Sequence, residues 1–176
     1  QGVAIVACLP KTAWPSDFIT DFLHMLGNPV GVISAGNSQS LERFLDLNYP
    51  LSILDVQRTM AVCAEDGAAA VILALSEETL NDDALQSVNV DVLGCDDKGL
   101  SEAEIVKSVA RFGCTVGKQT HIAGRTQESD ALAAQATEAY GQTDSSALSL
   151  SIAMVLAAGV RKANIKSALR VSRDLN

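Results

Sequence analysis

The segment Ala7-Cys8-Leu9-Pro10-Lys11-Thr12 carries some of the residue types of a phosphate-binding loop. In such a loop a lysine contacts the β- and γ-phosphates and a Ser or Thr holds Mg²⁺, while glycines let successive backbone N–H groups face the phosphates. Lys11 and Thr12 supply the first two features. The glycines are absent, and Pro10 removes one N–H donor. Taken by itself, a Lys-Thr pair in a loop also fits a segment that is simply solvated.

Three pairs of adjacent carboxylates are further candidates for chemistry: Glu77-Glu78, Asp82-Asp83 and Asp96-Asp97. Adjacent acidic residues in a loop usually form a solvated surface. Asp96 and Asp97 follow a predicted strand, which makes them the better candidates of the three pairs for a hard cation such as Mg²⁺.

The four cysteines, Cys8, Cys63, Cys95 and Cys114, are spread singly along the chain without a CxxC pair. This pattern favours small core residues in a reducing compartment over a disulfide framework or a zinc site. Nucleophilic catalysis by Cys8 or Cys95 stays open, because both lie near predicted strand ends, although no histidine is near them in the sequence. His121 lies in a strand-like segment and is interpreted as a structural residue rather than a base.

Alternating strands and helices are expected to position these residues. Apolar runs predict strands at 3–8, 30–34, 69–75, 88–93 and 115–123. Apolar stripes bounded by proline, capping residues or glycine predict helices at 15–26, 54–64, 102–112, 130–140, 146–158 and 164–169. The alternation predicts an α/β fold with a mainly parallel sheet and helices on both faces. Ligands collect at the carboxyl ends of strands in such a sheet, so the loop after the first strand is the first candidate site.

Composition limits the function classes. The chain has 176 residues, enough for one domain, and 48% hydrophobic with 19% charged residues exclude disorder. The 13 Lys+Arg and 21 Asp+Glu give a net charge of −8, which predicts no nucleic-acid partner. The longest mostly apolar run, 147–160, is broken by two serines and is shorter than the roughly 20 residues of a membrane span. We therefore expect a cytoplasmic protein without a membrane partner.

Several segments match one enzyme family in order, spacing and hydrophobic pattern. The first strand and its Lys11-Thr12 loop, followed by Leu26-Gly27-Asn28-Pro29-Val30-Gly31-Val32-Ile33, resemble the opening of the central ATP-binding domain of Mur ligases. Pro50 with Asp55-Val56-Gln57-Arg58 is similar to the segment after the family's Thr-Thr-Pro motif. The stretch 65–76 resembles its next strand, and 147–169 resembles its closing helix pair. The resemblance covers roughly residues 2–93 and 144–172.

Mur ligases join amino acids to UDP-N-acetylmuramoyl peptides in peptidoglycan synthesis. The resemblance implies a P-loop-NTPase-like fold for a single central domain over residues 1–176, shortened around 113–145 and without the N- and C-terminal ligase domains. It implies residual nucleotide binding at Lys11 and Thr12. It also matches Lys107 to the lysine that the family carbamylates to hold a second metal, although a lysine on a capped helix is more often simply solvent-exposed.

The chain departs from the family at the residues that carry its chemistry. The loop Gly-Thr-Asn-Gly-Lys-Thr has both glycines replaced, by Ala7 and Pro10. The magnesium-binding Glu falls at Ala74, the following Ser-Ser-His becomes Ser76-Glu77-Glu78, and Thr-Thr-Pro becomes Asn48-Tyr49-Pro50. No Asp-His pair follows the fourth predicted strand.

We therefore predict a degenerate, catalytically inactive domain. It would act as a binding or scaffold module toward a protein partner or the rest of a longer chain, with at most weak binding of a nucleotide or cell-wall precursor. The alternative is the central ATP-binding domain of a divergent, active ATP-dependent UDP-N-acetylmuramoyl-peptide amino-acid ligase. ATP and Mg²⁺ are expected as cofactors only under that alternative.

Overall fold

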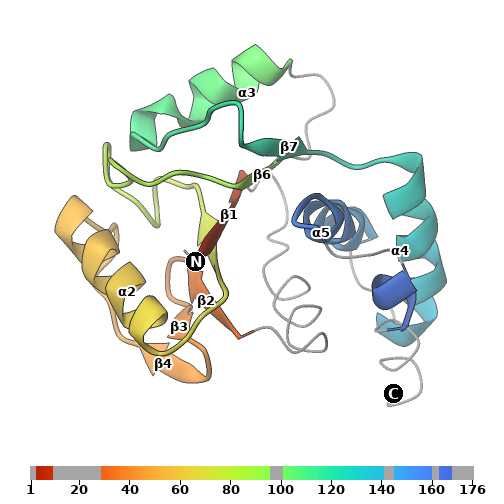
Figure 1. Cartoon of the computed structure of the whole chain (residues 1–176), viewed down its shortest axis with the longest axis horizontal. Coiled ribbons are helices and arrows are strands. Elements are labelled where there is room, and N and C mark those ends of the chain that lie inside the picture. The colour runs from red at the N-terminus through yellow and green to blue at the C-terminus, as the bar shows by residue number, and fades with distance from the viewer. Residues whose placement is uncertain (1–2, 10–28, 96–100, 141–144, 160–162, 168–176) are drawn as a thin grey trace.

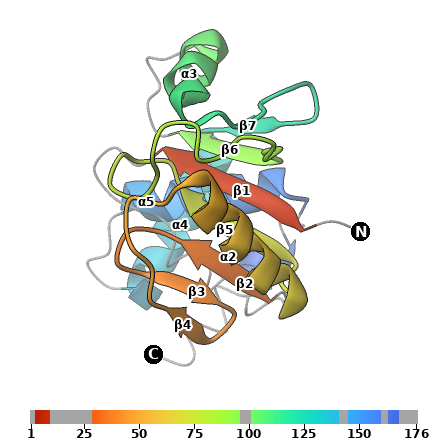
Figure 2. The same cartoon turned by 90° about the vertical axis from the view of Figure 1, so that its left-hand side faces the viewer.

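The computed structural model describes residues 3–9, 29–95, 101–140, 145–159 and 163–167. A seven-stranded sheet lies at the centre of these residues, with the order β4-β3-β2-β5-β1-β6-β7 (Figure 2). The strands are β1 (Ala4–Leu9), β2 (Val30–Ile33), β3 (Ser38–Ser40), β4 (Arg43–Leu45), β5 (Ala70–Ala74), β6 (Val92–Cys95) and β7 (His121–Ala123). The helices are α2 (Ile53–Glu65), α3 (Glu102–Val109), the 3₁₀ turn η1 (Ala110–Phe112), α4 (Gln127–Tyr140), α5 (Ser145–Ala157) and a short helix at 163–167.

Five of the seven strands are parallel, and β1 lies in the middle of them. β1 pairs with β5 on one side, with Val6 opposite Ile72, and with β6 on the other, with Val6 opposite Val92. β2 extends the parallel set beyond β5, and β7 extends it beyond β6. β3 and β4 add an antiparallel hairpin at the β2 edge. The predicted α/β class with a mainly parallel sheet is confirmed.

Helices cover both faces of the sheet (Figure 1). Val6 and Cys8 of β1 lie in one buried cluster with residues of α4 and α5, whereas Ile5 and Ala7 lie in a second cluster with residues of α2 and α3. This division follows from the strand period of two, which sends successive side chains to opposite faces. A strand buried on both faces reads as a continuous apolar run, as β1 does.

Capping residues fix the helix ends. Ser52 Oγ accepts from the Asp55 N–H at 3.2 Å, and the Asp55 carboxylate accepts from the Ser52 N–H at 3.1 Å, which completes a capping box at the start of α2. Ser101 Oγ accepts from the Glu104 N–H at 3.3 Å and caps α3 as expected. Gly113 has φ +82°, so it ends η1 in the left-handed region that favours glycine.

The structure corrects several predicted bounds. The β3–β4 hairpin was not expected, and its turn holds Leu41 at φ +57°. The strand predicted at 88–93 begins only at Val92, because the main chain of Val88 and Val90 bonds to Thr115 instead. The strand predicted at 115–123 is limited to His121–Ala123. The helix predicted at 15–26 lies outside the described residues.

α5 is the most apolar helix of the described chain. Leu148, Ile152 and Met154 are buried completely, and the helix packs beside α4 and against β6 and β7. With 13 residues it is nevertheless short. None of the helices in the described ranges is long and apolar enough to cross a membrane.

Candidate functional site

The carboxyl ends of β1 and β6 form the switch point of the parallel sheet. The strand that follows β1 in the sequence, β2, lies toward one edge of the sheet. The strand that follows β6, β7, lies toward the opposite edge. Leu9 and Cys95, the last residues of the two strands, are register partners. Adjacent strands whose connections diverge in this way leave a crevice beyond their carboxyl ends, which is where ligands bind in open α/β sheets.

The sequence-predicted site residues belong to the segments that leave these two strands. Lys11 and Thr12 come two and three residues after β1, and Asp96 and Asp97 come directly after β6. All four lie outside the described residues. The structure therefore fixes the strand ends from which the two segments start, and the assignment of these residues to a site stays a prediction.

Ala74 is the last residue of β5 and lies beside the end of β1. It is the register partner of Cys8, and the next residue, Leu75, donates its N–H to the Cys8 carbonyl at 2.9 Å. Ala74 is 3% exposed and Cys8 is buried completely. The position at which the family resemblance expects a magnesium-binding carboxylate is thus occupied by a buried methyl group.

Buried hydroxyl groups form hydrogen bonds at the carboxyl ends of β2 and β5. Thr79 Oγ1 accepts from the Ala35 N–H at 3.1 Å and lies 2.9 Å from Ser76 Oγ. Ser38 Oγ accepts from the Tyr49 hydroxyl at 2.6 Å and donates to the Ser34 carbonyl at 3.1 Å. Both Thr79 and Ser38 are buried. The Thr79 bond joins the loop after β5 to the loop after β2, and the Ser38 bonds join the start of β3 to Ser34 and Tyr49.

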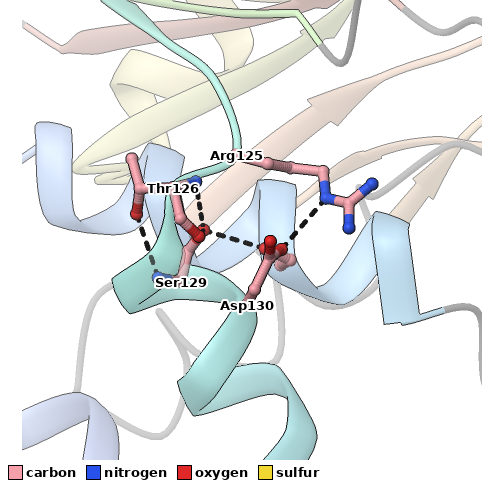
Figure 3. Close-up of polar contacts among 5 residues, drawn as sticks. Arg125, Thr126, Ser129 and Asp130 are labelled. Atoms are coloured by element: carbon pink, nitrogen blue, oxygen red, sulfur yellow. Dashed lines mark hydrogen bonds and ion pairs between the residues drawn. The ribbon is translucent and has the colours of Figure 1, made fainter. Parts of the chain in front are cut away.

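A second polar cluster lies at the other half of the edge, where β7 leads into α4 (Figure 3). Thr126 and Ser129 cap α4 reciprocally: the Thr126 N–H donates to Ser129 Oγ at 2.8 Å, and the Ser129 N–H donates to Thr126 Oγ1 at 3.0 Å. This cap explains why α4 begins at Gln127, three residues before the predicted start.

The same cluster holds an arginine. The Arg125 Nε donates to Asp130 Oδ1 at 3.1 Å, and Ser149 Oγ of α5 donates to the same oxygen at 2.6 Å. Ser149 Oγ also lies 2.8 Å from Ser129 Oγ, and both serines are buried completely. We call Arg125, Thr126, Ser129, Asp130 and Ser149 the β7–α4 cluster. This cluster was not predicted from the sequence, although the pattern Thr126-x-x-Ser129 after a strand is a capping signal.

The remaining sequence candidates lie elsewhere. Lys107 is exposed on α3, in the connection between β6 and β7. The exposed Glu77 and Asp82 form ion pairs with Arg111 on η1, and these bonds raise the pKa of the guanidinium above its ordinary value. These two carboxylates are therefore part of a surface ion-pair network. In the described part of the chain, no group of three or more His, Cys, Asp or Glu side chains could hold a metal ion.

The cysteines are free thiols, and most of them belong to the core. Cys8, Cys63 and Cys95 are buried, and Cys114 is half-buried. Burial raises the pKa of the Cys63 and Cys114 thiols, which disfavours the thiolate that a nucleophile needs. His121 begins the edge strand β7 and is exposed. The described geometry thus offers no cysteine–histidine pair.

No protein-family model matches this chain, and no curated protein is significantly similar to it.

Proposed function

We propose that this chain is a Mur-ligase-like domain that has lost catalysis and acts as a binding or scaffold module. Its ligand would be a nucleotide or cell-wall precursor, bound weakly at most. Two features support the nucleotide-binding ancestry: β1 is the central parallel strand and ends at the switch point, and Lys11 and Thr12 follow it in the sequence. A strand followed by a lysine-containing loop at this position is the arrangement that phosphate-binding folds use.

Ala74 carries the argument for lost catalysis. Formation of an acyl phosphate from ATP requires metal ions that bridge the phosphates and charges positioned around the transferring group. At the end of β5 the chain presents a buried methyl group beside buried Cys8. In other enzymes, removal of one hydrogen-bond donor from an oxyanion hole costs about 3–4 kcal/mol of transition-state stabilisation, which indicates the scale of losing one positioned electrostatic group. The loop lacks its glycines as well, so we expect no measurable ligase turnover.

The proposal is tested by measuring turnover and binding separately. The purified chain is incubated with Mg-ATP, a UDP-N-acetylmuramoyl peptide and amino acids, and release of ADP and phosphate is followed. We expect none above the rate without protein. Turnover at enzymatic rates would instead establish the alternative, a divergent active ligase, and would contradict our proposal.

Binding is followed by thermal unfolding with increasing Mg-ATP. A ligand at 100 times its Kd adds about 2.7 kcal/mol to the stability of the folded state. We expect at most a small rise in Tm at millimolar ATP, and Lys11→Ala should remove it. Lys118→Ala is the matched control, because Lys118 is exposed and lies before β7, away from the strand ends. An ATP-dependent rise that survives in Lys11→Ala would contradict the loop assignment.

A further inference from the structure

The strand β4 is a free edge of the sheet. In the described chain it pairs with β3 alone, at the end of the strand order (Figure 2). The Leu41 N–H donates to the Val30 carbonyl of β2 at 3.0 Å. Since main-chain groups of successive residues point to opposite sides of a strand, those of Ser40 point toward its register partner Arg43 and form the hydrogen-bonded pair. The N–H and carbonyl of the next residue, Phe44, therefore face away from β3.

The side chain of Phe44 is exposed at the same edge. It is 62% exposed, the largest such fraction among the large apolar side chains of the described residues. A single exposed apolar side chain is ordinary by itself, but here it accompanies unpaired main-chain groups, which are a template for another strand. Because β4 has only three residues, an added strand gains few main-chain bonds and needs matching side chains as well.

Two carboxylates flank Phe44 at the spacing of a strand. Glu42 and Asp46 each lie two residues from Phe44, and both are exposed. Residues two apart along an extended segment share a face, so an added strand would place its own side chains beside these three. Neither carboxylate forms an ion pair within the described ranges, whereas Arg43 is paired with Asp66 at 2.6 Å. The uncompensated charge at the free edge is therefore negative.

We propose that β4 is a docking edge for an extended segment of a partner protein in which basic residues lie two positions before and two positions after an apolar residue. The segment adds a strand to the sheet, with its apolar residue beside Phe44 and its basic residues beside Glu42 and Asp46. This inference rests on the scaffold role proposed above, and it names the surface and the class of partner that this role uses.

The same charges disfavour a second copy of this chain as the occupant. Antiparallel pairing of two β4 strands about Phe44 would set Glu42 of each copy opposite Asp46 of the other. Like charges directly opposite each other destabilise a strand pair, and the net charge of −8 adds repulsion between two copies. The carboxylates thus act against self-association and favour a basic partner, and specific interfaces combine these two effects.

The test follows binding of two capped peptides to the ¹⁵N-labelled full chain by NMR. One peptide is Thr-Lys-Thr-Val-Thr-Lys-Thr, and the other has Glu in place of both Lys residues. At millimolar concentration we expect the basic peptide to shift the amide signals of residues 42–46 and the acidic peptide to leave them unchanged. The shifts should weaken as salt is added, because the carboxylates are exposed. Equal effects of the two peptides, no effect of the basic peptide, or shifts confined to other segments would overturn the inference.

Reversal of the edge charges tests the side-chain match. Glu42→Lys/Asp46→Lys should weaken binding of the basic peptide about tenfold and make the acidic peptide the better ligand. Glu78→Lys/Glu102→Lys is the matched control, because it makes the same change of net charge at exposed carboxylates elsewhere. It should leave the preference for the basic peptide unchanged. An equal loss of preference in both double variants would show general charge attraction and contradict docking at β4.

A proline tests the main-chain contact. Phe44→Pro removes the N–H that faces away from β3 and removes no bond of the hairpin, and proline is tolerated at such edge positions. We expect it to abolish the shifts, with far-UV circular dichroism as the check of folding. Unchanged binding by a folded Phe44→Pro would overturn the inference. So would a dimer of the natural chain, seen by sedimentation, that Phe44→Pro abolishes, since the occupant would then be a second copy. These results are distinct from ligase turnover, by which the proposed loss of catalysis is judged.

Discussion

Ile5 and Asp91 are joined by two hydrogen bonds at the amino end of the central strands. Asp91 Oδ2 accepts from the Ile5 N–H at 2.7 Å, and the Asp91 N–H donates to the Ile5 carbonyl at 2.9 Å. The Asp91 carbonyl in turn accepts from the His121 N–H at 2.8 Å. This aspartate therefore links β1, β6 and β7, and its side chain takes the place of a main-chain acceptor in the ladder.

Substitution of Asp91 should destabilise the fold. Asp91→Ala leaves the N–H of the buried Ile5 without its acceptor, which we expect to cost about 1–3 kcal/mol. Asp91→Asn keeps a side-chain oxygen and should lose less. The free energy of unfolding is measured in urea, with Glu78→Ala as a control at an exposed carboxylate. Equal unfolding midpoints for Asp91→Ala and Glu78→Ala would show that the side-chain bond contributes nothing.

Gly94 should not tolerate a side chain. A Cβ atom at this position of β6 would overlap the side chain of Met154, which is buried completely in α5. We expect Gly94→Ala to cost about 1–3 kcal/mol, as overpacking does in other cores. Gly117→Ala is the matched control, because a Cβ there would meet no atom within 4 Å. In the Gly94→Ala/Met154→Ala double variant the cost should be less than the sum of the two single costs; simple additivity would contradict the clash.

Ser40 and Asp66 predict a dependence of stability on pH. Ser40 Oγ donates to Asp66 Oδ2 at 2.6 Å, and this bond, followed by that of Arg43, lowers the pKa of Asp66. A lowered carboxyl pKa stabilises the folded state above the unfolded value of about 3.9, and this stabilisation is lost as the pH falls through the folded value.

Removing the hydroxyl tests this contribution. In Ser40→Ala the pKa of Asp66, followed by carboxyl ¹³C chemical shifts, should rise toward its ordinary value. The stability difference between Ser40→Ala and the natural chain should shrink as the pH falls below about 4. Ser108→Ala is the control, since Ser108 Oγ donates to a carbonyl, that of Glu104. A Ser40→Ala effect of constant size across this pH range would rule out the linkage.

The thiols should differ in reactivity. Cys8 and Cys63 are buried completely, whereas Cys114 is half-buried and its pKa is raised by burial. We expect Ellman's reagent to modify Cys114 first and slowly at neutral pH, and the buried thiols only on unfolding. Cys114→Ser should abolish this first reaction. Rapid labelling that survives in Cys114→Ser would show that a core thiol is accessible in the folded protein.

Local signals explain which parts of the fold could be predicted. β1, β2 and β5 are apolar runs bounded by polar or turn residues, α2 carries an apolar stripe with a glycine after its end, and α3 begins at a capping serine. Each was therefore expected nearly where it lies. The β3–β4 hairpin offers no such signal. Its strands have three residues each, and its turn places Leu41 in the left-handed region where Gly or Asn is the usual residue.

The candidate site was less accessible to prediction, because its contacts are long-range. Nothing near Asp130 in the sequence indicates that Ser149 will reach its carboxylate, since this contact depends on how α4 packs beside α5. The loss of a metal-binding carboxylate at Ala74, by contrast, was predicted from the family resemblance alone. The burial of Ala74 beside Cys8 follows from the register of β5 and β1. The Mur-ligase resemblance itself stays a prediction.

The central place of β1 has a consequence for how the chain folds. Among the described strands β1 is synthesised before the others, yet its Val6 pairs with Ile72 of β5 and Val92 of β6, which emerge from the ribosome much later. Pairings so distant in sequence slow folding and leave apolar segments exposed in the meantime. During synthesis β1 therefore lacks its β5 partner until residue 74 has been made, and its β6 partner until residue 95 has been made. The strand that organises the sheet is the first to be synthesised and among the last to be enclosed.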